Sequence, residues 1–291
     1  MEFVGTPDGR RLAVETWGDP NGSPVFLLHG TPGSRLGPHP RDAVLYRQRI
    51  RMIAYDRPGY GGSDRSLGRV VGDAATDTAA IADAFGIDRF AVVGRSGGGP
   101  HALACAALLP ERVTRAAALV TLAPPDADGL DWFAGMSQSN VREYTIASSG
   151  GTAFSTWVEE AADVIRADPR RLILSLLQEV PEPDRRIVAD AGIRAMLAGN
   201  FAEALRESAH GWVDDSLAFR SPWGFEPRSI DRPVVLWHGE DDVFSPVGHA
   251  QWLAEEIPTA QLVRHPGAAH FGALGVLPNL LPWLVADVRA A

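Results

Sequence analysis

The chain has 291 residues and a net charge of −9 at pH 7, and 45% of its residues are hydrophobic. That length can bury the core of one α/β domain with an insertion, and the acidic balance argues against nucleic acid or an anionic membrane as a partner. The absence of lysine excludes Schiff-base lysine chemistry, and the single cysteine, Cys105, cannot form an internal disulfide and is interpreted as a small buried residue.

The first part of the chain alternates predicted strands with predicted helices, as a doubly wound sheet requires. Strands are predicted near residues 11–16, 24–28, 50–55, 90–94 and 115–121. Helices are predicted near residues 40–48, 70–85 and 98–109. No apolar run approaches the roughly 18 residues of a membrane helix. The first residues show no charged region followed by a long apolar segment, so we expect no secretory leader. We therefore expect a cytoplasmic protein that makes no membrane contact.

A buried strand is followed by the turn His-Gly-Thr-Pro-Gly at residues 29–33. Its glycines let the backbone come close to a substrate. The N–H of Thr31 is therefore a candidate donor to a negatively charged oxygen. His29 is interpreted as a scaffold residue.

A serine stands between a predicted strand and a predicted helix in the segment Phe90–Gly99. Gly94 and Gly98 flank Ser96 in a G-x-S-x-G pattern. The backbone turns abruptly there, and a side chain at either glycine position would collide with neighbouring elements. The turn exposes the Ser96 hydroxyl at a helix N-terminus, which favours developing negative charge. We predict that Ser96 is a nucleophile and that the N–H groups of Thr31 and Gly97 form an oxyanion hole.

The strand pattern stops after Pro125 and resumes near Val234. We predict that residues 125–229 form an inserted cap of four or five short helices, and that residues 1–124 and 230–291 form the core. Most large apolar side chains of the cap are interpreted as packing residues, with two or three in a substrate pocket. The pocket candidates are Met136, Trp157, Trp212 and Phe219. Acidic cap residues could bind a substrate ammonium, although a solvated helix face is their more common role; they are Glu143, Glu203 and Glu207.

The strand that begins near Val234 ends in a glycine turn with three consecutive acids, Glu240, Asp241 and Asp242. An activated serine needs a base and a carboxylate that orients the base, and this turn offers the carboxylate. The same acids could instead be charges at a helix start, which are common on any surface.

Eight histidines compete for the role of base. His270 lies in a loop after the last predicted strand, on the sheet edge where Ser96 and the acidic turn are expected. We predict that His270 is the base. Four other histidines are interpreted as structural: His101, His238, His249 and His265.

Together these motifs resemble the serine hydrolases of the α/β-hydrolase superfamily. The segment Tyr55–Ser63 also resembles the Asp-x-x-Gly-x-Gly-x-Ser loop of that family. The similarity covers most of the chain and is greatest to the group with a helical cap after the sixth strand, which includes esterases, proline iminopeptidases and carbon–carbon bond hydrolases. It implies an α/β fold with a mostly parallel, doubly wound sheet of about eight strands. It also favours Asp242, by its Asp-x-x-x-Pro spacing, while some relatives use the position of Asp126.

Some residues depart from the family pattern. The residue before the nucleophile is Arg95, where relatives often have His, Asn or Phe, and the residue after it is the small Gly97. Thr31 and Gly97 replace a glycine and a tryptophan that are typical of iminopeptidases. Ala269 replaces the usual glycine before the base, and Ser96 argues against the relatives that use an aspartate nucleophile.

We therefore expect a serine hydrolase that cleaves a small, largely apolar carboxylic ester or lactone through an acyl-enzyme, as a monomer or homodimer. We expect no cofactor and no metal, because the chain has no H-E-x-x-H motif, no P-loop and no G-x-G-x-x-G. The alternatives within the family are an iminopeptidase-like enzyme and a carbon–carbon bond hydrolase. Alternatives of another class are a ligand receptor and a non-hydrolytic biosynthetic enzyme on the same fold.

Overall fold

The computed structural model describes residues 1–286. Its core is an eight-stranded sheet with the order β1-β2-β4-β3-β5-β6-β7-β8. The strands are β1 (Glu2–Gly5), β2 (Arg11–Gly18), β3 (Ser23–Leu28), β4 (Ile50–Tyr55), β5 (Phe90–Arg95), β6 (Val113–Leu119), β7 (Val234–Gly239) and β8 (Ala260–His265). β2 pairs antiparallel with both β1 and β4, and the remaining pairs are parallel. The predicted fold class is confirmed.

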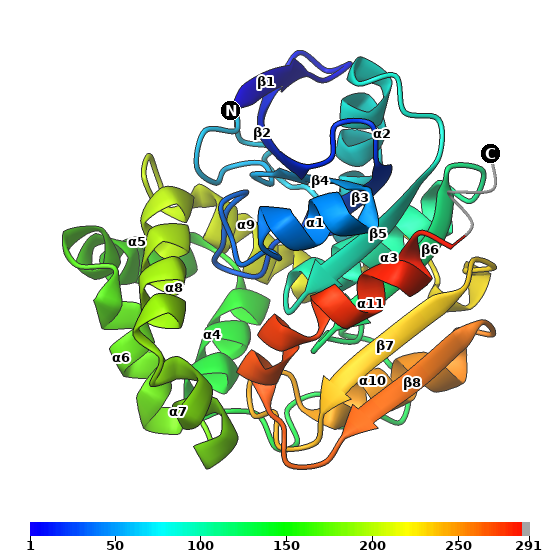
Figure 1. The fold of residues 1–291 in the computed structure, drawn as a ribbon. Helices are drawn as coiled ribbons and strands as arrows, with labels where there is room; N and C mark the ends of the chain where they lie inside the picture. The colour runs from blue at the N-terminus through cyan, green and yellow to red at the C-terminus, as the bar shows by residue number, and fades with distance from the viewer. Residues whose placement is uncertain (287–291) are drawn as a thin grey trace.

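The central strands are buried on both faces because helices cover the sheet on both sides (Figure 1). Alternate side chains enter two separate hydrophobic cores: Phe26 of β3 joins the core with α2 and α3, whereas Leu27 joins the core with α1 and α11. The helices of this part are α1 (Asp42–Gln48), α2 (Ala74–Ala84), α3 (Gly98–Leu108), α10 (Val247–Glu256) and α11 (Leu277–Leu284). Short 3-10 helices are η1 (Val71–Asp73), η2 (Pro227–Ser229) and η3 (His270–Gly275).

Six helices lie between β6 and β7 in the chain, where four or five were predicted. They are α4 (Gln138–Ser149), α5 (Thr152–Ala167), α6 (Arg170–Glu179), α7 (Glu182–Val188), α8 (Ala191–Ala204) and α9 (His210–Phe219). Figure 1 shows them gathered on one side of the sheet, in green to yellow, and we call this group the cap. Its apolar side chains form a third hydrophobic core. No helix in the described part of the chain has the length and apolar character needed to cross a membrane.

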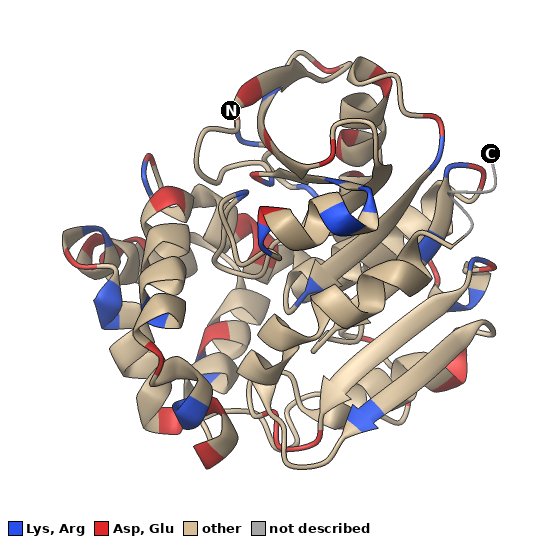
Figure 2. Cartoon of the chain, viewed as in Figure 1, with Lys and Arg blue, Asp and Glu red and all other residues tan. Residues whose placement is uncertain are grey.

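The parallel direction of the strands determines where the site forms. The C-terminal ends of β3, β5, β7 and β8 meet at one edge of the sheet, and each is followed by one of the motifs singled out in the sequence. Charged residues lie mainly on helices and in loops, and the central strands carry few of them (Figure 2).

Candidate active site

Ser96 occupies a strained turn between β5 and α3. Its φ is 54°, in the left-handed region that side-chain-bearing residues rarely adopt, at a cost of roughly 1–2 kcal/mol. Its N–H donates to the carbonyl oxygen of Leu119 at 2.8 Å. A Cβ at Gly94 would lie 1.9 Å from the carbonyl oxygen of Gly98, so a glycine is required there. The local packing therefore has the form predicted for a nucleophile turn.

His270 and Asp242 form a buried hydrogen-bonded pair. His270 Nδ1 lies 2.8 Å from Asp242 Oδ2. The other carboxylate oxygen, Oδ1, accepts the N–H groups of Phe244 at 2.8 Å and Ser245 at 3.0 Å. Because an ionised carboxylate only accepts hydrogen bonds, Nδ1 carries the proton and Nε2 of His270 is free to accept one.

The other candidate acids are placed differently. Asp241 and Asp126 are both exposed, and neither side chain has a hydrogen-bond partner in the described part of the chain. Of the three aspartates, only Asp242 contacts His270.

Burial and nearby charges shift the pKa of His270 in opposite directions. Burial favours its neutral form, but the charge and hydrogen bond of Asp242 outweigh burial and raise the pKa of His270 above its ordinary value. The carboxylate of Asp184 raises this pKa further, and the guanidinium of Arg95 lowers it. The net effect favours an imidazole that can take a proton.

Ser96 and His270 line one cavity of about 130 Å³, together with Thr31 and Gly97. Neither the N–H of Thr31 nor that of Gly97 has an acceptor among the residues that the structure describes. Unpaired backbone donors at a cavity are available to a ligand oxygen.

A buried ion cluster holds the turn that contains Thr31. The Thr31 hydroxyl donates to Asp215 of α9 at 2.6 Å and accepts from Arg57 at 3.1 Å. Asp215 also accepts from Tyr60 at 2.9 Å and from Arg69 at 2.6 Å. Burial opposes the charge of Asp215, but the two guanidinium groups hold its pKa well below the usual range. The cap thereby fixes the position of Thr31.

A larger cavity of about 740 Å³ adjoins the first, and Trp157 and Trp212 line it. The two cavities share the lining residues Thr31, Pro32, Asn140, Glu143, Leu176 and Phe201. Met136 and Phe219 line neither cavity. Both are buried in the same hydrophobic core, and Phe219 packs edge to face against His101.

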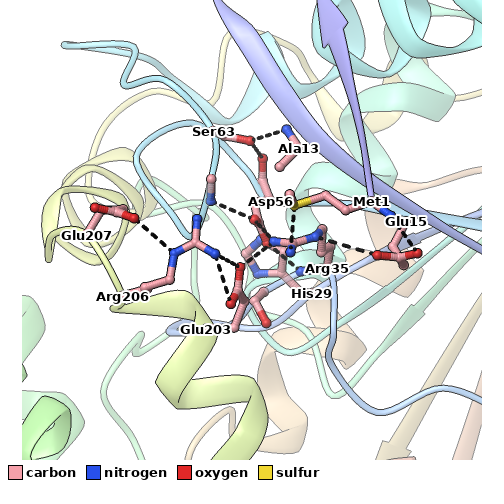
Figure 3. A network of polar contacts seen from close by, with 12 residues as sticks. Met1, Ala13, Glu15, His29, Arg35, Asp56, Ser63, Glu203, Arg206 and Glu207 are labelled. Carbon is pink, nitrogen blue, oxygen red and sulfur yellow. Dashed lines mark hydrogen bonds and ion pairs between the residues drawn. The ribbon is translucent and has the colours of Figure 1, made fainter.

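The three acidic cap residues have different surroundings. Glu143 lines both cavities, and its Oε1 accepts from Trp212 at 2.8 Å and from Ser216 at 2.6 Å. Burial raises the pKa of Glu143. Glu203 and Glu207 line neither cavity and pair with arginines instead, as Figure 3 shows.

Two carboxylates at the site were not found by sequence reasoning. Asp215 anchors Thr31, and Asp184 of α7 accepts the N–H of Phe271 at 2.8 Å, next to His270. Burial raises the pKa of Asp184 to about 6. Both lie on cap helices whose sequence is compatible with an exposed acidic face, so no local signal marked them.

Comparisons with known proteins show the family to which the chain belongs. A family model described as alpha/beta hydrolase fold matches residues 23–275. The chain is 27% identical over 268 residues to a pimeloyl-[acyl-carrier protein] methyl ester esterase of Nitrosomonas europaea, covering 89% of this chain and 92% of the relative. It is 27% identical over 307 residues to a non-heme chloroperoxidase of Streptomyces lividans, covering 100% of both.

Solved structures support the same fold. A thermophilic esterase from Thermogutta terrifontis matches with a TM-score of 0.70 and 21% identity, over 99% of this chain and 98% of that chain. The family model spans most of the chain, including the strands of the site. The chain therefore belongs to the α/β-hydrolase fold family and is similar to its esterases.

Proposed function

We propose that this protein is a serine hydrolase that cleaves a small, largely apolar carboxylic ester or lactone through an acyl-enzyme intermediate. The observation that carries the proposal is the 2.8 Å pair of His270 and Asp242 at a cavity that Ser96 also lines. The similarity to an esterase over 89% of the chain supports the same reaction class.

In the proposed mechanism, Ser96 Oγ attacks the ester carbonyl while Nε2 of His270 takes its proton. Asp242 orients the imidazole and stabilises the imidazolium. The N–H groups of Thr31 and Gly97 bind the oxygen of the tetrahedral intermediate. His270 then protonates the leaving alcohol, and it activates the water that hydrolyses the acyl-enzyme.

The cavity linings support an apolar acyl group. The wider cavity is lined by several large apolar side chains, including Trp157, Leu172 and Leu176, and it adjoins the cavity of Ser96. Apolar walls with a few polar groups are typical of sites for small organic ligands.

Glu143 favours a second candidate, an iminopeptidase-like enzyme. A cap carboxylate at the cavity could bind the ammonium of an amino-acyl ester or amide. Thr31 and Gly97, which depart from the iminopeptidase pattern, weigh against it. Comparing proline 4-nitroanilide with 4-nitrophenyl butyrate distinguishes the two candidates.

Covalent labelling tests the proposal directly. We expect a fluorophosphonate to modify Ser96, because His270 activates its hydroxyl, and we expect 4-nitrophenyl butyrate to be hydrolysed. Ser96→Ala should abolish both labelling and turnover. The measurements are mass-spectrometric mapping of the adduct and initial rates.

The matched control is Ser155→Ala, which changes an exposed cap serine. It should label and turn over like the wild type. An adduct on another residue would overturn the assignment of the nucleophile. Labelling of Ser96 without turnover of any ester, lactone or amide would favour a receptor or a non-hydrolytic enzyme.

A further inference from the structure

Arg95 lies beside the nucleophile and has no counter-ion among residues 1–286. It is the last residue of β5, and Ser96 follows it directly. Among the residues that the structure describes, its only hydrogen bond runs from Nη1 to the carbonyl oxygen of Pro38, at 3.3 Å. The Nε of Arg95 is buried and has no acceptor. The guanidinium of Arg95 forms no ion pair within the described chain.

Arg95 is partly exposed, whereas the arginines that are fully buried in the described chain are paired with carboxylates. Arg57 and Arg69 both contact Asp215, and Arg35 contacts Asp56. Burial lowers the pKa of Arg95 to about 10, so the group is still protonated at neutral pH. Partial burial of an unpaired charge is unfavourable for folding, and a ligand that brings the opposite charge reduces that penalty.

The position of Arg95 indicates where such a ligand would bind. Arg95 lines the 130 Å³ cavity together with Ser96, His270 and Pro38. Pro38 also accepts the Arg95 hydrogen bond, which holds the guanidinium at the cavity wall. Glu143 lines the same cavity, but its Oε1 is bound to Trp212 and Ser216 and it makes no ion pair with Arg95.

Asn200 of α8 supplies a second donor at the same place. It lines the cavity, and its Oδ1 accepts the N–H of Ser34 at 2.9 Å. The amide is thereby oriented with Nδ2 as its free end, and Nδ2 has no acceptor among the described residues. Asn200 and Arg95 also line a small neighbouring cavity together with Gly37 and Pro38. Both side chains therefore lie next to the segment that contains Gly37 and Pro38.

We propose that Arg95 and Asn200 bind a carboxylate of the substrate. This inference rests on the proposed function and narrows its substrate class to esters or lactones that carry a carboxylate close to the scissile carbonyl. Arg95 neutralises the carboxylate, and Asn200 Nδ2 donates a hydrogen bond to it. The apolar walls contact the rest of the acyl group.

A pair of shape-matched methyl esters tests this binding. Monomethyl glutarate carries the carboxylate, and methyl 5-methylhexanoate has an isopropyl group in its place. We expect the wild type to prefer the anionic ester, and we expect Arg95→Met to lower the ratio of kcat/KM between the anionic and neutral esters at least tenfold. Asn200→Asp, which keeps the acceptor for Ser34 but replaces the donor with a negative charge, should also lower this ratio.

The matched control is Arg89→Met, which removes an exposed cation just before β5 that lines neither cavity. Its ratio should equal that of the wild type. Monomethyl succinate and adipate, each with its isopropyl analogue, cover other distances between carboxylate and carbonyl. Equal ratios in wild type and Arg95→Met for all three pairs, with the neutral esters still hydrolysed, would overturn the proposal.

A binding measurement separates this inference from the proposed function. Calorimetry on Ser96→Ala should show monomethyl glutarate binding at least tenfold more tightly than methyl 5-methylhexanoate, and Ser96→Ala/Arg95→Met should lose the difference. If the Arg95→Met change abolishes the difference in binding and the wild type hydrolyses neither ester, the result supports the carboxylate site and contradicts the proposed hydrolase. Equal binding of both esters to Ser96→Ala would contradict the carboxylate site, whatever the activity of the wild type.

Discussion

Asp241 and Asp242 are chemically identical neighbours in opposite environments. Asp241 is exposed, whereas Asp242 is buried, with both oxygens engaged by two backbone N–H groups and by His270. A carboxylate held in this way fixes the tautomer of the imidazole as well as its orientation.

We therefore expect Asp242→Asn to lower kcat by a factor on the order of 10⁴, because an amide no longer stabilises the imidazolium or the required tautomer. The measurement is kcat for 4-nitrophenyl butyrate. Asp241→Asn, the control with the same chemical change, should stay within about twofold of the wild type. An Asp242→Asn enzyme that keeps most of its activity would rule out the assigned role.

Sequence reasoning could identify residues whose signal is local. Ser96 and His270 each follow a strand within a few residues and were predicted from those patterns. The strand before Asp242 led only to a turn with three acids, and the resemblance to the α/β-hydrolase superfamily selected Asp242 among them. Asp215 was not predicted, because its contact with Thr31 joins positions 184 residues apart. The pairing of Asp184 with Phe271 spans 87 residues, and neither partner carries a motif.

At the scale of elements, the predicted strands agree with β2 to β6 to within two residues at each end, because buried parallel strands give continuous apolar runs. The edge strand β1 was missed, since it has four residues and buries only Val4. α7 begins at Glu182 although Pro181 and Pro183 stand on either side of its first residue. Its Pro183 stands in the first helical turn, where a backbone N–H is not needed.

The contact between α7 and η3 makes stability depend on pH. Burial raises the pKa of Asp184 from 3.8 to about 6, so the folded protein binds this proton more tightly than the unfolded chain does. The stability contributed by the protonated carboxyl is present below about pH 4 and is lost as pH rises to about 6. Above that range the folded state contains a buried charge whose Oδ2 has no partner in the described chain.

We expect Asp184→Asn to gain stability relative to the wild type as pH rises from 4 to 7, by on the order of 2 kcal/mol. Asparagine cannot ionise, and its Oδ1 can still accept the N–H of Phe271. Urea unfolding at both pH values measures the difference. Asp126→Asn, which removes an exposed carboxylate, controls for net charge. If the free energies of unfolding of Asp184→Asn and the wild type differed by the same amount at pH 4 and pH 7, the result would contradict the raised pKa of Asp184.

At the scale of the whole molecule, ion pairs join the cap to the core, with the arginine on the core and the carboxylate on the cap. Core arginines pair with cap carboxylates in Arg57–Asp215, Arg65–Asp214 and Arg35–Glu203. Asp215 is fully buried, and removing one partner of such a pair leaves an uncompensated charge. The cap is therefore fixed over the edge where Ser96 lies, and its side chains can define the shape of the substrate cavity.

This arrangement predicts that the cavity-lining side chains of the cap determine acyl length. Trp157→Ala and Trp212→Ala enlarge the cavity of about 740 Å³, so we expect both to raise kcat/KM for 4-nitrophenyl octanoate relative to the butyrate. Met136→Ala and Phe219→Ala, which change buried residues outside both cavities, should leave that ratio unaltered and instead lower the free energy of unfolding by about 2–5 kcal/mol. Fluorophosphonate labelling of each variant checks that Ser96 is still reactive. If all four folded variants kept the wild-type ratio, the cap would cover the site without selecting the acyl group.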